Sequence, residues 1–135
     1  MSDLLAPHGK PEYEPYDHFM GQNSRDQNAV MYPTIAAQLN DPAARIEPMD
    51  AMGVQIQGLA TFVSQYGYWA PAPLAAEAAR IQNDNLAQAA ANHPDRFVPC
   101  GATVPLQNVE LAIEEMNRAV DELGFKGLQI GGTVD

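Results

Sequence analysis

Apolar and polar positions begin to recur regularly only after the first 40 residues of the chain. Residues 1–40 are rich in Pro, Asn, Gln and Tyr and keep no period of 2 or 3.6, which predicts an irregular or weakly helical segment. A short helix around residues 35–39 is compatible with the pattern. From residue 41 onward helical and strand periods alternate, so we divide the chain into an irregular N-terminal segment, 1–40, and a β/α domain, 41–135.

The first helix of this domain is predicted to begin after Asp41 and to end at Gly53. Asp41 is a good capping residue, the proline after it suits a first helical position, and glycine is common just past a helix end. Pro48 falls inside this helix and lacks an amide proton, a defect of about 3 kcal/mol unless the helix bends or breaks. We therefore expect a kink at Pro48. The residues expected to face inward are Ile46 and Met49.

Three apolar runs are predicted to be strands, at residues 54–62, 97–104 and 127–130, and the first has the character of a strand buried on both faces. Pro99 and Gly101 interrupt the second run, which indicates either an edge position or a bulge.

Two helices are predicted between these strands. An Ala-rich helix follows Pro73 and should stop before Pro94, and a second begins after the capping residue Asn108 and ends at Gly124. The alternation of helices and strands with short connections predicts parallel strands in an α/β layer structure. The apolar stripe of the second helix consists of Val109, Ala112, Ile113, Met116, Ala119, Val120 and Leu123.

Composition and charge narrow the range of functions. The 135 residues are 46% hydrophobic and 18% charged, which is typical of a globular domain rather than a disordered chain. Seven basic against 17 acidic residues give a net charge of −10, which repels nucleic acid and anionic membrane surfaces. No apolar run is long enough to cross a bilayer, and the N-terminus lacks the pattern of a signal peptide. We expect a cytoplasmic protein.

Residues that bear metal or nucleophilic chemistry are few. Cys100 is the single cysteine, which agrees with a reducing compartment, and we expect it to be a small buried apolar residue. A zinc site needs three or four converging ligands, whereas His8, His18 and His93 are scattered without a recognisable spacing. We therefore predict no catalytic residue and no metal or other cofactor site in this chain.

Several motifs, taken in order, resemble the amidohydrolase-related metal-dependent decarboxylases, the family of aminocarboxymuconate-semialdehyde decarboxylase. Each motif alone is weak, but the ordered set is specific, and it is similar to the N-terminal portion of such proteins. The motifs are DPAARI at 41–46, MDAMGV at 49–54, YWA at 68–70, HPDRF at 93–97, VPLQ at 104–107 and ELGFKGLQIG at 122–131.

The resemblance implies a (β/α) TIM-type barrel longer than this chain, of which the chain would form about three parallel strands with flanking helices. It also implies zinc or another divalent metal at the carboxyl ends of the strands, and non-oxidative release of CO₂ from an unsaturated carboxylic acid. Members begin with a strand that ends in His-x-His and take further ligands from later strands. The nearest approach here is His8-Gly9-Lys10, in which the lysine is a poor ligand.

Two further departures concern the substrate and the second strand. The segment 32–40 contains no Arg where family members with acidic substrates hold a carboxylate, and the stretch 97–105 is about one residue longer than the family pattern. We expect a fragment of a metal-dependent carboxy-lyase that is inactive alone. The alternatives are a non-catalytic half-barrel that serves as a binding or assembly module, and a metal-dependent hydrolase of the same superfamily.

The strand ends carry the candidate site. Thr61, Thr103 and residues 131–133 close the three strands and would face the mouth of a complete barrel. Thr61 and Thr133 are the candidates for substrate contact. Alternatively, these hydroxyls satisfy backbone groups at the strand ends.

Tyr68 and Trp69 would either line the rim of the pocket or cover the end of the barrel. The expected partners are a small-molecule carboxylic acid, once the missing half of the barrel completes the site, and a second copy or a complementary chain that pairs with the open sheet edges.

Overall fold

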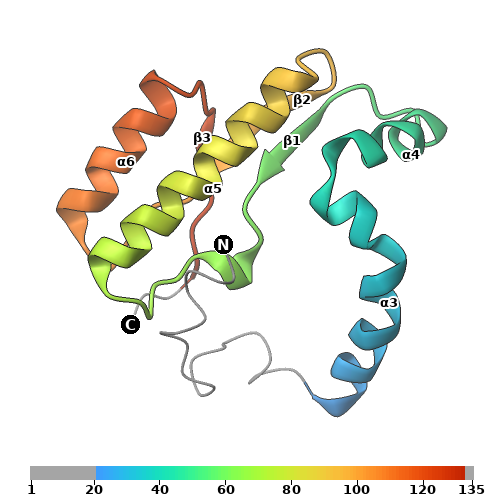
Figure 1. Cartoon of the computed structure of the whole chain (residues 1–135), viewed down its shortest axis with the longest axis horizontal. Coiled ribbons are helices and arrows are strands. Elements are labelled where there is room, and N and C mark those ends of the chain that lie inside the picture. Colours follow the sequence, from blue (N-terminus) through green and yellow to red (C-terminus); the bar gives the residue numbers. More distant parts are fainter. Residues whose placement is uncertain (1–20, 133–135) are drawn as a thin grey trace.

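Figure 1 shows the computed structural model, which describes residues 21–132 apart from the side chain of Ser64. Within this range the helices are α3 (Gln22–Asn40), α4 (Ile46–Ala51), α5 (Ala72–Asn92) and α6 (Val109–Asp121), with 3-10 helices η3 (Pro42–Arg45) and η4 (Val63–Gln65). The strands are β1 (Gln57–Ala60), β2 (Phe97–Ala102) and β3 (Gly127–Leu128).

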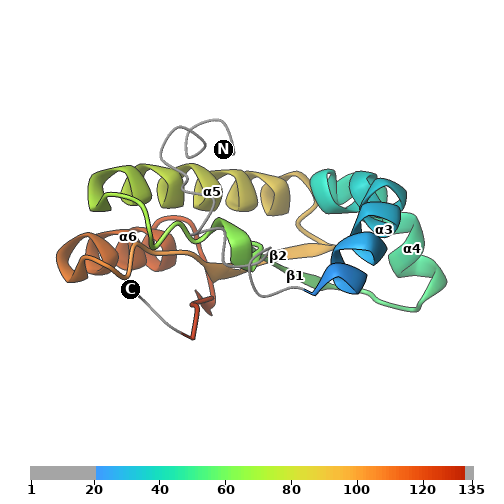
Figure 2. The same ribbon diagram turned by 90° about the horizontal axis from the view of Figure 1, so that it is seen from below.

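The strands form one parallel sheet in the order β1-β2-β3, which confirms the predicted α/β arrangement. Helices α5 and α6 lie side by side on the same face of the sheet (Figure 2). The opposite face carries neither of these two helices. In a closed barrel with helices outside, that second face would be the interior.

Helix α3 is the main departure from the predicted secondary structure. Residues 22–40 were expected to be irregular or weakly helical, with a short helix around 35–39, but they form one continuous helix through Pro33. Helix α3 buries none of its residues, and its sequence shows no apolar face. Hydrophobic periodicity therefore could not reveal this helix. Residues 1–20 lie outside the described residues, and the division of domains at residue 41 remains a prediction.

The segment after α3 is capped as predicted but breaks at a different residue. The Asp41 carboxylate accepts a hydrogen bond of 2.9 Å from the Ala43 amide. The chain then forms a 3-10 helix, and α4 begins anew at Ile46. Pro48 therefore lies in the first turn of α4, where helical amides have no partner within the helix. The predicted kink at Pro48 is wrong because the break precedes it.

The core lies between the sheet and the helices. Met49 is 1% exposed, as predicted, and packs with Leu59, Ala90 and Phe97, with Ile46 against them. A second cluster joins the end of β2 to α6 through Ala102, Ala119 and Phe125. Alanines dominate the buried face of α5, which lets the helix approach the sheet closely.

Strand β2 is the central strand and contains a bulge. Leu59 pairs with Pro99 and Ala60 with Gly101, so Cys100 has no partner in β1. Of the two predicted explanations for Pro99 and Gly101, the bulge is correct and the edge position is wrong. Cys100 is exposed, contrary to the expectation that it is buried, because it lies beside Gly58 on the face opposite the buried Leu59.

Candidate functional site

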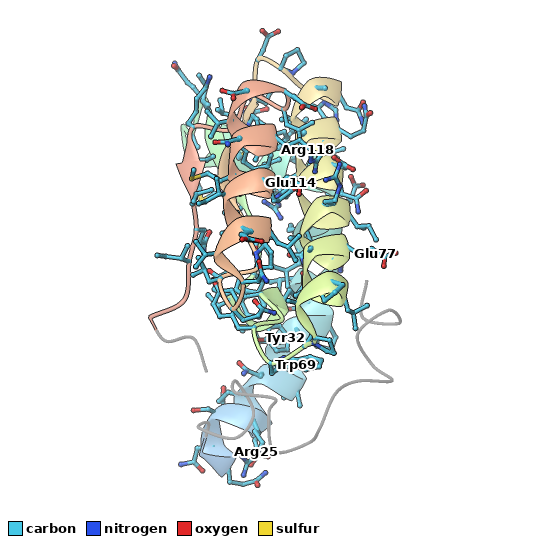
Figure 3. The ribbon with its side chains drawn as sticks, turned by 90° about the vertical axis from the view of Figure 1, so that its left-hand side faces the viewer. Arg25, Tyr32, Trp69, Glu77, Glu114 and Arg118 are labelled. Atoms are coloured by element: carbon cyan, nitrogen blue, oxygen red, sulfur yellow. The ribbon has the colours of Figure 1, made fainter. Side chains whose placement is uncertain are left out.

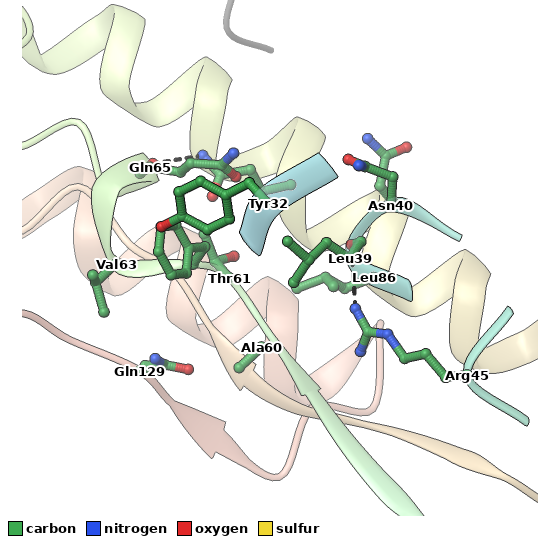
Figure 4. Close-up of a pocket in the computed structure, with 13 residues that line it drawn as sticks. Tyr32, Leu39, Asn40, Arg45, Ala60, Thr61, Val63, Gln65, Leu86 and Gln129 are labelled. Carbon is green, nitrogen blue, oxygen red and sulfur yellow. Dashed lines mark hydrogen bonds between the residues drawn. The ribbon is translucent and has the colours of Figure 1, made fainter. Parts of the chain in front are cut away.

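A pocket of about 570 Å³ opens near the carboxyl end of β1 (Figure 4). Parallel strands bring their carboxyl ends to one edge of the sheet, so residues that follow β1 and β3 meet here. The lining residues are Tyr32, Leu39, Asn40, Arg45, Ala60, Thr61, Phe62, Val63, Gln65, Gln82, Asn85, Leu86 and Gln129.

Carboxamides are the most frequent polar groups of this pocket. Five of the lining residues are Asn or Gln, from α3, η4, α5 and the end of β3, and none is Asp, Glu, Lys or His. Leu39, Phe62 and Leu86 add apolar surface. The pocket therefore offers paired hydrogen-bond donors and acceptors between apolar walls.

Thr61 lies in this pocket, where the strand-end pattern placed it. Its side chain is 5% exposed, and its Oγ1 is buried without a hydrogen-bond partner among the described residues. Among residues 21–132, this hydroxyl donates to no backbone group. Contact with a substrate remains a prediction. Thr133, the second candidate, lies outside the described residues.

Thr103 follows β2 and is held by a buried side chain of α5. Asn83 is 0% exposed, donates from Nδ2 to the Thr103 carbonyl at 2.9 Å, and accepts at Oδ1 from the Thr103 amide at 2.9 Å. The same Nδ2 donates to Glu115 of α6 at 2.7 Å. One side chain thus links the end of β2 to both helices.

Glu115 is 2% exposed and is neutralised by Arg118, which donates to its two oxygens at 2.7 and 2.9 Å. Arg118 lies between α5 and α6 (Figure 3) and also donates to Asp84 at 2.6 Å. The Glu115 carboxylate raises the pKa of Arg118 above its usual range. Sequence reasoning missed Asn83 and Glu115, because a polar residue on an apolar helical face indicates burial only when its distant partners are known.

Arg45 is the one basic residue among the described residues that line the pocket. Its Nε donates to the Gln38 carbonyl and its Nη2 to the Leu39 carbonyl at 3.2 Å, while Nη1 reaches Gln57 at 3.5 Å. The guanidinium therefore donates hydrogen bonds to carbonyls in the last turn of α3, where a positive charge is favourable.

Tyr68 and Trp69 have different surroundings. The Tyr68 hydroxyl accepts a hydrogen bond of 3.2 Å from the Gly131 amide, and burial raises the pKa of this tyrosine. Trp69 packs against the cluster of Ala70, Ala75 and Ala78. Neither is among the residues that line the pocket.

The histidines do not converge within the part of the chain that the structure describes. His93 caps the C-terminus of α5 and meets Phe97 edge to face, with ring centroids 6.0 Å apart. His8 and His18 lie outside that part. Between residues 21 and 132, no three His, Cys, Asp or Glu side chains form a group that could hold a metal ion. These residues therefore do not fit the metal that the family resemblance implies.

Comparison with known sequences identifies related proteins. The profile of the amidohydrolase family matches residues 34–135. The chain is 39% identical over 95 residues to 2-amino-3-carboxymuconate-6-semialdehyde decarboxylase of Dictyostelium discoideum, covering 70% of this chain and 26% of that protein. It is 38% identical over 88 residues to gamma-resorcylate decarboxylase of Rhizobium sp. (strain MTP-10005), covering 65% and 27%.

Solved structures that resemble this chain also include decarboxylases. A 2,6-dihydroxybenzoate decarboxylase complexed with 2,6-dihydroxybenzoate superimposes with a TM-score of 0.64 and 36% identity, over 67% of this chain and 28% of that one. A dihydroxybenzoic acid decarboxylase from Polaromonas sp. JS666, solved with manganese and 2-nitroresorcinol, gives a TM-score of 0.73 and 29% identity, over 94% and 36%. The fold prediction of a partial TIM-type barrel is confirmed, and the chain spans about a third or less of each relative's length.

None of the helices described between residues 21 and 132 has the length and apolar character that spanning a membrane requires.

Proposed function

The chain belongs to the amidohydrolase family, and from this membership we propose that it forms part of a carboxy-lyase that releases CO₂ from an unsaturated carboxylic acid. The observation that carries the proposal is the profile match over residues 34–135, combined with named decarboxylases among the similar sequences and structures. Because the chain spans only part of each relative, activity and substrate are proposed for the completed barrel.

The position of the pocket supports this proposal. TIM-type barrels carry their active sites at the carboxyl ends of the strands, and the pocket opens near the carboxyl end of β1. Thr61, directly after β1, contributes a buried hydroxyl without a partner among residues 21–132. We propose that Thr61, and Thr133 beyond the described residues, contact the substrate.

We propose that the residues of this chain bind and orient the substrate and do not themselves break its bonds. The carboxamides of the pocket would orient the polar groups of a substrate, and Leu39, Phe62 and Leu86 would exclude water from it. The Polaromonas relative was solved with manganese, but the described residues do not supply a ligand set for a divalent ion. We therefore propose that the chain alone neither holds a metal tightly nor decarboxylates.

A chimeric enzyme tests the proposal. The homologous segment of the Rhizobium decarboxylase is replaced by residues 41–131 of this chain, and CO₂ release from 2,6-dihydroxybenzoate is measured. We expect activity in the chimera. Thr61→Val should lower its rate about fivefold, which is the effect of one lost hydrogen bond, whereas Thr61→Ser, which keeps the hydroxyl, should not.

A second experiment measures the metal content and the CO₂ release of the isolated chain. After incubation with Mn²⁺ or Zn²⁺ and desalting, elemental analysis should find no stoichiometric metal, and no CO₂ should be released. A folded but inactive chimera would contradict the decarboxylase assignment. One tightly bound ion per isolated chain, together with turnover, would contradict the proposed dependence on the rest of the barrel.

A further inference from the structure

The apolar stripe of α6 is wider than the face of this helix that the structure buries. Ala119 is 0% exposed and packs with Ala102 of β2. Val109, Ile113 and Val120 belong to the same stripe but are 70%, 49% and 44% exposed. Helix α6 therefore carries more apolar surface than the described elements cover.

The exposed apolar residues lie on the side of α6 that points away from α5. Successive residues of a helix are turned by about 100°, which places Val109, Ile113 and Val120 within about 40° of one another. Arg118, which donates to a carboxylate of α5, lies about 180° from Val109. Figure 1 shows α5 on one side of α6 and no other described helix on its other side. We call these three residues, with the half-buried Met116 between them, the outer flank of α6.

The outer flank continues onto the edge strand of the sheet. Leu128 pairs with Ala102, and paired residues of neighbouring strands point to the same face. Because Ala102 packs with Ala119, Leu128 faces the helices, and it is 37% exposed. Since α5 contacts β1 and β2, the flank of α6 away from α5 lies on the β3 side. Within the described chain β3 has a neighbouring strand on one side only, so this apolar surface borders the open edge of the sheet.

Carboxylates line the solvent side of the outer flank. Ala119, which faces the sheet, precedes Val120, so Asp121 lies on the opposite side of Val120, and Glu110 has the same place beside Val109. Both carboxylates are exposed, and neither forms an ion pair within residues 21–132. The whole chain has a net charge of −10. Repulsion between like charges therefore disfavours a second copy at this flank and favours a partner with basic side chains.

The topology of the sheet indicates that the partner element is a helix. Two parallel strands joined by a helix form a right-handed crossover, which places successive helices on one face of the sheet. Helices α5 and α6 both lie on this face (Figure 2). A helix that leads into a further parallel strand beside β3 would therefore lie against the outer flank.

We propose that the outer flank of α6, together with Leu128, is a docking surface for an amphipathic helix whose apolar side chains are flanked by Lys or Arg. This helix covers the exposed apolar residues and places its basic groups beside Glu110 and Asp121. A second copy of the chain is the disfavoured occupant, because the same carboxylates would meet across a two-fold interface. That the helix belongs to a partner which completes the barrel rests on the proposed function.

Two synthetic peptides test this surface. Both are helices of about 18 residues, or five turns, with the same stripe of Leu and Ile, and one carries Lys beside the stripe where the other carries Glu. Binding of each labelled peptide to the full chain is followed by fluorescence anisotropy. At low salt the Lys peptide should bind about tenfold more tightly than the Glu peptide, because attractive charge pairs replace repulsive ones. The difference should shrink at about 0.15 M salt, which screens exposed charges.

Substitutions of exposed residues assign the binding to the outer flank. Ile113→Ser and Val120→Ser should each weaken the Lys peptide about fivefold, because each variant loses the burial of about half a branched side chain. Glu110→Lys combined with Asp121→Lys should reverse the preference between the two peptides. Ile81→Ser on α5, where Ile81 is 38% exposed, is the matched control and should bind both peptides as the wild type does. Circular dichroism checks that each variant keeps the helical content of the wild type.

Three results would overturn the proposal. They are equal affinity for the two peptides at low salt, wild-type affinity for the Lys peptide in both serine variants, and self-association of the chain that the serine variants abolish, since a second copy would then occupy the flank. Binding is measured without turnover, so an inactive chimera leaves the docking surface intact. Conversely, failure of both peptides to bind overturns the docking surface and leaves CO₂ release by the chimera as a separate result.

Discussion

Asn83→Asp replaces the amide NH2 group of a fully buried side chain with an oxygen. Asn83 is 0% exposed, and its Nδ2 donates to the Thr103 carbonyl at 2.9 Å and to the Glu115 carboxylate at 2.7 Å. The substitution keeps the shape and the hydrogen bond accepted from the Thr103 amide. It removes both donated hydrogen bonds and places two carboxylates side by side.

The loss in the free energy of unfolding follows from the two donated hydrogen bonds that Asn83→Asp removes. A hydrogen bond to a neutral group contributes about 1 kcal/mol and one to a charged group about 1.5–3 kcal/mol. The acceptors left behind are buried, and the like charges repel, so the free energy of unfolding should fall by about 3–5 kcal/mol at pH 8. Typical domains have only about 5–15 kcal/mol of stability, so the variant should be close to unfolding.

The effect should depend on pH in a defined direction. Burial and the neighbouring Glu115 raise the pKa of the introduced carboxyl above its unfolded value of about 3.9. The folded variant therefore binds a proton more tightly than the unfolded variant does, and it regains stability as the pH falls from its folded pKa toward the unfolded one. The loss relative to wild type should be smaller at pH 5 than at pH 8.

Urea unfolding followed by circular dichroism at both pH values measures this loss. Asn85→Asp, two residues along the same helix at an exposed position, is the matched control and should change stability by less than about 0.5 kcal/mol. Adding Glu115→Gln to Asn83→Asp should recover part of the loss, because an amide can donate to the new carboxylate. If Asn83→Asp unfolds at the wild-type urea concentration at pH 8, the hydrogen-bond network does not stabilise the end of β2 as described.

Three further outcomes are expected. Gly101→Ala should lower stability by about 1–3 kcal/mol, because a new Cβ would lie 2.9 Å from those of Ala60 and Gln129, whereas Gly132→Ala has nothing within 4 Å and should be neutral in thermal unfolding. The exposed Cys100 should react with a thiol reagent in the folded chain, and reaction only in denaturant would contradict its placement. Because Ile56 and Ile130 are 61% and 56% exposed beside the sheet, the isolated chain should self-associate with rising concentration, and sedimentation as a monomer throughout would contradict this.

The family and the general fold could be predicted from the sequence, but only part of the site could. Thr61 was found because the end of a strand is visible as the end of an apolar run, and it does line the pocket. Gln129 was missed because its access to the pocket depends on Gly101, a residue of the neighbouring strand. Asn83 was missed because a polar residue on a helix is read as solvated unless its partners are known, and these partners lie 20 and 32 residues away.

By itself, the sequence determined the features that depend on a few consecutive residues. Asn108 caps α6 by accepting from the Leu111 amide at 2.9 Å, and Gly124, at a φ of 73°, follows the end of that helix, because capping and positive φ are local requirements. The tertiary structure alone decided that Cys100 is exposed and that Glu115 is buried. Their environments are set by the bulge between β1 and β2 and by the packing of α6 on α5, and both depend on residues distant in the chain.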